Sequence, residues 1–69
     1  MATELARKDF GMTDKGQVVV IEKQSYDDLG VNLISTFEVR HGVRTIGAYD
    51  TQRKADAVAS ALAKAIHED

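Results

Sequence analysis

A chain of 69 residues without a single cysteine has to hold its fold by packing alone or by association with another chain. So short a domain buries only about 60% of the surface that its unfolded form exposes. A core of this size rarely contributes more than about 3–5 kcal/mol. Disulfides are excluded, and the two histidines stand far apart in the sequence, which argues against a structural zinc site. We therefore expect one domain that is either a well-packed monomer or a homodimer.

The composition is typical of a folded protein outside the membrane. Hydrophobic residues make up 43% of the chain and charged residues 29%. The longest apolar run, Val18–Ile21, is far shorter than the roughly 20 residues that cross a bilayer. The N-terminus has no hydrophobic region of the kind found in signal peptides. We expect a cytoplasmic protein that does not contact a membrane. Its net charge of −2 disfavours nucleic acid as a partner, because phosphates attract basic domains.

The first part of the chain predicts a short helix. Residues 3–10 consist mostly of good helix formers, with Thr3 as the N-cap and Gly11 as the stop. The apolar stripe of this helix is thin, so an isolated helix would be marginal. We expect residues 1–16 to form this helix and a loop, ordered or as a flexible tail, and residues 17–69 to form the sheet and the last helix of a single domain.

Three strands are expected next. Residues 17–23 are β-branched at four successive positions, which favours a strand covered on both faces. Residues 31–40 alternate between apolar and polar side chains, the pattern of a strand with one buried face. His41 and Gly42 fit a two-residue turn to a third strand. That turn would place Arg40 opposite Val43 and would bring Phe37 and Ile46 together on the buried face.

The last element is a helix from Gln52 to His67. Apolar residues recur with helical spacing, and Asp50 or Thr51 can cap the N-terminus. The resulting fold class is α+β, with the order α-β-β-β-α: a three-stranded antiparallel meander packed on a C-terminal helix, with a short N-terminal helix. The apolar stripe repeats at these positions: Ala55, Val58, Ala59, Leu62 and Ile66.

This order of elements, with several local sequences, resembles the double-stranded RNA-binding domain, and it is also similar to small phage and plasmid proteins with a meander and a helix. The similar parts are residues 4–8, residues 37–39, the turn with Gly47, and residues 51–55. The resemblance implies binding of duplex RNA across two minor grooves. It implies roles for Arg7 and Lys8 in the first helix and for Arg53 and Lys54 in the last. The sequence departs from the family in the middle contact loop, where residues 26–32 carry two aspartates.

No catalytic, metal or cofactor site is expected. The sequence places no Ser, Cys or carboxylate beside His41 or His67 in a catalytic pattern. Asp27 and Asp28 lack the alternating spacing of a calcium loop and fit a solvated turn better.

The sheet face away from the helix carries the candidate partner-binding residues Ile34, Val43 and Tyr49. An apolar strip there would mark a contact with a protein partner or a second copy, although isolated apolar residues on a surface are also normal. Our leading hypothesis is a non-enzymatic interaction protein, such as an inhibitor or accessory factor of a phage or plasmid. The alternative is a nucleic-acid-binding domain that uses the cations named above.

Overall fold

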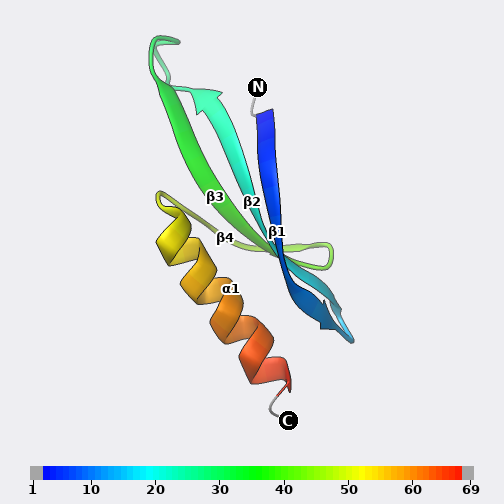
Figure 1. Ribbon diagram of the computed structural model, residues 1–69. Coiled ribbons are helices and arrows are strands. Elements are labelled where there is room, and N and C mark those ends of the chain that lie inside the picture. Colours follow the sequence, from blue (N-terminus) through cyan, green and yellow to red (C-terminus); the bar gives the residue numbers. More distant parts are fainter. Residues whose placement is uncertain (1–2, 68–69) are drawn as a thin grey trace.

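The computed structural model describes residues 3–67, with side chains up to Lys64, and has four strands followed by one helix. The strands form one antiparallel sheet in the order in which they occur in the chain, and the helix lies across one face of it (Figure 1). The α+β class and the antiparallel meander are confirmed, but the sheet has four strands instead of three. The elements are β1 (Thr3–Thr13), β2 (Gly16–Tyr26), β3 (Leu33–His41), β4 (Arg44–Tyr49) and α1 (Gln52–His67).

The predicted N-terminal helix is wrong, because this segment is the edge strand β1. It pairs with β2 along nearly its whole length, from Thr3 opposite Gln24 to Thr13 opposite Gly16, with two bulges. A short helix with a thin apolar stripe has little to bury. As a strand, the same residues pair with one side of β2 and place Phe10 against the core. Tertiary pairing therefore overrides the local helix propensity of these residues.

The strand β2 runs through the middle of the molecule and is buried on both faces. Successive side chains of a strand point to opposite faces. Val18 and Val20 face α1, whereas Val19 and Ile21 face the other side of the sheet, and all four are buried. This is the covering of both faces that the run of β-branched residues predicted.

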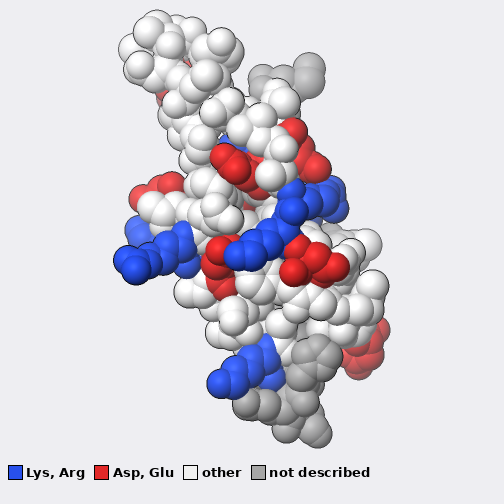
Figure 2. All heavy atoms as spheres, in the orientation of Figure 1, with Lys and Arg blue, Asp and Glu red and all other residues white. Residues whose placement is uncertain are grey.

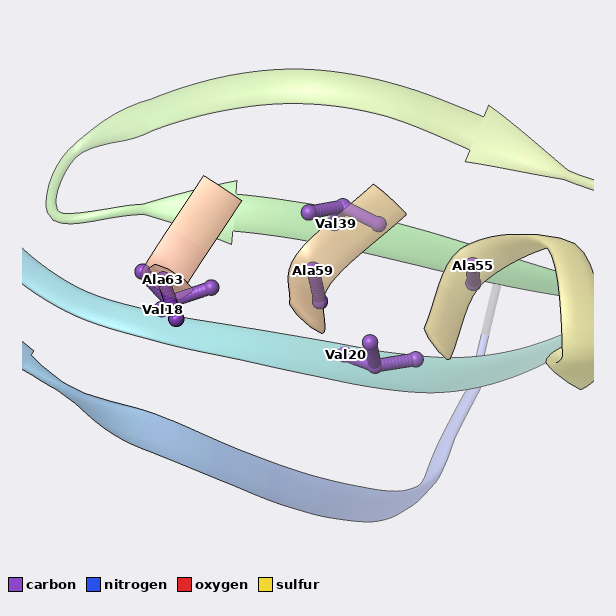
Figure 3. Close-up of a cluster of buried hydrophobic side chains, with 6 residues drawn as sticks. All are labelled: Val18, Val20, Val39, Ala55, Ala59 and Ala63. Carbon is purple, nitrogen blue, oxygen red and sulfur yellow. The ribbon is translucent and has the colours of Figure 1, made fainter. Parts of the chain in front are cut away.

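The helix α1 has the predicted bounds and packs on the sheet through alanines. Thr51 is the N-cap, since its hydroxyl accepts a hydrogen bond from the Lys54 amide at 3.3 Å. The small side chains of this stripe allow a close approach to β2 and β3, as Figure 3 shows. Larger, partly buried side chains surround this centre, so the core is small and made of small residues. Its buried members are Val18, Val20, Val39, Ala55, Ala59 and Ala63.

The hairpin between β3 and β4 has a different register from the predicted one. Its turn residues are Gly42 and Val43, so that His41 lies opposite Arg44. Gly42 has a φ of 63°, which suits the first turn position of a hairpin and which His41 would adopt only at a cost. A bulge at Ile46 then brings Tyr49 opposite Phe37 on the helix side. Ile46 is therefore 40% exposed and does not meet Phe37 in the core.

At the other end of the sheet, β2 and β3 extend beyond their neighbours as a two-stranded arm. In the described chain, the pairing of β1 ends at Gln24, and the pairing of β4 begins at Phe37. We call residues 25–34 the β2–β3 arm. It projects past the end of α1 (Figure 1) and contributes to the elongated shape of 46 × 20 × 16 Å.

Candidate interaction surface

The β2–β3 arm concentrates the exposed apolar side chains of the protein. Five of the nine large hydrophobic side chains that are exposed in the described part of the chain belong to it. In Figure 2 this end of the molecule is almost entirely white, whereas Lys and Arg lie further down. A concentration of exposed apolar side chains in one segment is typical of a contact site. The five residues are Tyr26, Leu29, Val31, Leu33 and Ile34.

Asp27 fixes the loop at the tip of the arm. One carboxylate oxygen accepts hydrogen bonds from the amides of Val31 at 3.1 Å and Asn32 at 3.4 Å, and the other accepts one from Asn32 Nδ2 at 2.9 Å. The amides of Asp27 and Gly30 close the loop with bonds of 2.9 Å to the carbonyls of Asn32 and Asp27. The hydrogen bond from the Val31 amide, followed by that from the Asn32 side chain, lowers the pKa of Asp27.

The apolar tip is therefore presented by a hydrogen-bonded loop. Leu29 is 83% exposed and Val31 is 72% exposed, although the main chain on both sides of them is tied to Asp27. Ordering a contact segment before binding lowers the entropy cost of the complex. The carboxylate of Asp27 accepts hydrogen bonds from its own loop, in agreement with the interpretation of this segment as a turn.

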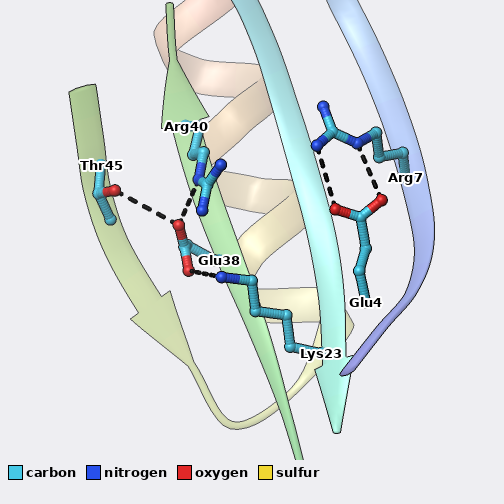
Figure 4. Close-up of polar contacts among 6 residues, drawn as sticks. All are labelled: Glu4, Arg7, Lys23, Glu38, Arg40 and Thr45. Carbon is cyan, nitrogen blue, oxygen red and sulfur yellow. Dashed lines mark hydrogen bonds and ion pairs between the residues drawn. The ribbon is translucent and has the colours of Figure 1, made fainter. Parts of the chain in front are cut away.

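The open face of the sheet, which is the face away from α1, carries a charged cluster instead of an apolar strip (Figure 4). Arg7 donates two hydrogen bonds of 3.0 Å to the carboxylate of Glu4. Glu38 accepts hydrogen bonds from Arg40, from Lys23 at 3.0 Å and from a threonine hydroxyl at 3.3 Å. The members are Glu4, Arg7, Lys23, Glu38, Arg40 and Thr45.

These contacts affect the acids and the apolar residues beneath them. The hydrogen bond from Arg40, followed by that from Lys23, lowers the pKa of Glu38, and the hydrogen bond from Arg7 lowers the pKa of Glu4. Ile21, which lies between Arg7 and Glu38 in the sheet, is completely buried. Long charged side chains bury their stems over apolar neighbours in this way while their charged ends remain in water.

The three predicted partner-binding residues are not brought together. Ile34 lies on the open face in the β2–β3 arm and is exposed. Val43 is fully exposed in the turn at the opposite end of the sheet. Tyr49 lies on the helix side and packs against the core, so the expectation that it shares a face with Ile34 is wrong. The reason is the shifted register and the bulge at Ile46.

The four cations of the nucleic-acid alternative are also separated, and three of them have carboxylate partners. Besides the pair formed by Arg7, Lys8 Nζ lies 3.0 Å from Asp56 Oδ2 and 5.2 Å from the centre of the Phe10 ring. Lys54 Nζ lies 3.0 Å from Asp50 Oδ1, and this contact lowers the pKa of Asp50. Arg53 is exposed in the first turn of α1.

The two hairpin turns meet at the far end of the sheet. A Cβ placed on Gly16 would lie 2.5 Å from the Cα of Gly42, so the two backbones are in direct contact. Thr13 donates its hydroxyl proton to the carbonyl of Gly16 at 2.8 Å, and its oxygen lies 2.6 Å from His41 Nε2. The nearby hollow of about 270 Å³ is lined by Lys15, His41, Val43 and Arg44.

The described residues form neither a metal-binding cluster nor a membrane-spanning helix. Among residues 3–64, whose side chains are described, no three His, Cys, Asp or Glu side chains gather as a metal site requires. In that same stretch, no helix is both long and apolar enough to span a bilayer. The side chain of His67 lies outside the described residues.

The exposure of Leu29, Val31 and Leu33 was not predicted: Leu29 was assigned to an acidic turn, and Val31 and Leu33 to the buried face of a strand, whereas all three are exposed in the structure. The signal that could have indicated them is the stretch from Leu29 to Phe37, which contains no charged residue. No family model, curated protein or solved structure matched this chain.

Proposed function

We propose that this protein is a small non-enzymatic interaction module that contacts its partner through the β2–β3 arm. The single observation that supports this most directly is the ordered apolar tip, in which Asp27 fixes a loop that exposes Leu29 and Val31. Apolar side chains at the centre of an interface contribute most of its binding energy. Such a contact would suit an inhibitor or accessory factor, of the phage or plasmid type, that occupies a surface of a larger complex.

The alternative is binding of nucleic acid, and the arrangement of cations supports it less well. Arg7, Lys8 and Lys54 each form an ion pair with a carboxylate of the same chain. A phosphate would have to compete with these partners, and it would approach a protein of net charge −2. The basic hollow between the two hairpin turns is the observation that favours this alternative, since Lys15 and Arg44 line it. A mobility-shift titration with duplex RNA and duplex DNA at low salt tests it.

Site-specific photo-crosslinking tests the proposed contact surface. A photoreactive amino acid is placed at Leu29 in the arm, and in separate proteins at Val43 and at Ala57. Val43 is the matched control, because it is also a highly exposed apolar turn residue, at the opposite end of the sheet. Ala57 is an exposed position on α1.

We expect a discrete crosslinked species from position 29 in cells that produce the protein, and none from position 57. The double substitution L29S and V31S should remove a contact detected from position 33. If crosslinks arise only from position 43, or equally from all three positions, the arm is not the contact surface.

A further inference from the structure

The outer edge of β3, from the β2–β3 arm to residue 36, lacks a partner strand in the described chain. The pairing of β4 stops at Phe37, so residues 33–36 have β2 on one side only. Main-chain groups along a strand point alternately to its two sides. Two hydrogen bonds fix this alternation: the Gly42 amide donates to the Gln17 carbonyl, and the Asp27 amide donates to the Asn32 carbonyl. The main-chain amides and carbonyls of the even-numbered residues of β3 therefore point to β2. The amides and carbonyls of Leu33 and Ser35 therefore point outward.

This edge of β3 also lacks the features that keep the other edges of the sheet from pairing with another chain. Natural edge strands avoid pairing with other chains through bulges, charged side chains or short length. The strand β1 has two bulges and four charged residues, and β4 has only six residues and one bulge. The free segment of β3 has no bulge, and the stretch from Leu29 to Phe37 has no charge. It remains competent for strand addition.

We propose that a second copy of this chain pairs with this edge, antiparallel, about a two-fold axis at Ile34. Leu33 of each copy then lies opposite Ser35 of the other, and each of these pairs exchanges two main-chain hydrogen bonds. The two Ile34 residues face each other at the axis, about 4.5 Å apart between Cα atoms, with their side chains in contact on the open face. The inference rests on the proposed function, since it names the partner of the same arm.

Three features favour a second copy over an unrelated strand. Antiparallel pairing about a two-fold axis is self-complementary, so one edge meets its own counterpart. No like charges meet, because residues 29–37 are uncharged. The core consists of valines and alanines, and small domains with so little buried volume often gain stability by association. A standard interface of about 800 Å² for each partner would cover roughly a sixth of the 4914 Å² surface of this chain.

Sedimentation or light scattering over a range of protein concentrations, with charge substitutions at the axis, tests the proposal. The wild type should pass from monomer to dimer with rising concentration. I34K and I34E should each be monomeric up to about 1 mM, because each places two like charges at the axis. An equimolar mixture of I34K and I34E should form a dimer again, a rescue that only apposition of the two residues produces. V43K is the matched control and should dimerise like the wild type.

Hydrogen exchange provides a second measurement that does not depend on these variants. In the dimer the amides of Leu33 and Ser35 should exchange more slowly than in the diluted protein, whereas those of neighbouring even-numbered residues should not change. A wild type that stays monomeric up to about 1 mM overturns the inference. So does a dimer that persists in both single variants. If the wild type is monomeric but still forms a discrete crosslink to another protein from position 29, the proposed function stands and only the dimer is refuted. If the monomeric wild type forms no such crosslink, the proposed function and the dimer are both refuted.

Discussion

Replacing Val39 by alanine should destabilise the protein strongly, because Val39 is completely buried between the sheet and the alanine stripe of α1. The substitution removes two carbon atoms. Each buried carbon contributes about 0.8 kcal/mol. The remaining cavity adds to this loss, because the surroundings relax only in part. The expected loss is about 2–3 kcal/mol, a large part of the roughly 3–5 kcal/mol that a core of this size supplies.

The matched control is the same substitution at Val43, which lies in the turn that follows β3 and is fully exposed. It should change the free energy of unfolding by less than about 0.5 kcal/mol. Urea denaturation followed by circular dichroism measures both variants, at one fixed protein concentration because self-association would alter the apparent stability. In thermal melts, V39A should lower the midpoint by roughly 10–20 °C.

The reasoning is refuted if V39A and V43A unfold at the same urea concentration with the same slope. That result would mean that Val39 is not enclosed by close-packed neighbours. A smaller slope for V39A alone would indicate a change in the compactness of one of the two states.

Three further predictions concern the turns and the acids. G16A should unfold at a lower temperature than G30A, since its Cβ would lie 2.5 Å from Gly42 whereas nothing lies near a Cβ at Gly30, and both positions have positive φ. E38Q should lower stability at pH 7 by about 1 kcal/mol. Because folding lowers the pKa of Glu38 from 4.5, its ionised carboxylate stabilises the folded state above that pH, and this stabilisation is lost as the pH falls through the folded pKa. Urea titrations at several pH values should therefore show a smaller acid-dependent loss of stability in E38Q than in the wild type. Asp27 has a pKa lowered from 3.8, so NMR should show the loop amides keeping their native shifts down to that pH and losing them only below it.

The helix and its cap were predictable because both depend on neighbours in the sequence. The bounds from Gln52 to His67 follow from the helical spacing of apolar residues, and Thr51 caps the N-terminus as its residue type predicts. The strand β2 was equally clear from its β-branched run. Its burial on both faces followed from the absence of polar side chains at four successive positions.

The strand β1 and the partner-binding residues were not predictable in this way. Residues 3–10 have helix propensity, and only the unpaired side of β2 gives them a strand to join. Tyr49 changed face because a bulge at Ile46 shifts the register, and a shift by one residue exchanges the two faces of a strand. The open face of the sheet is charged because three strands bring Glu4, Lys23 and Glu38 into one cluster.

The sequence by itself determined the class of the fold, the last helix, the central strand and the absence of disulfides, since these depend on composition and on local periodicity. Only the tertiary structure decided that the N-terminal segment is a strand and that β2 and β3 extend beyond β1 and β4 as an arm. The physical reason is that strand pairing is non-local: where a strand begins, ends and faces is set by hydrogen bonds to residues distant in the chain, which no local pattern records.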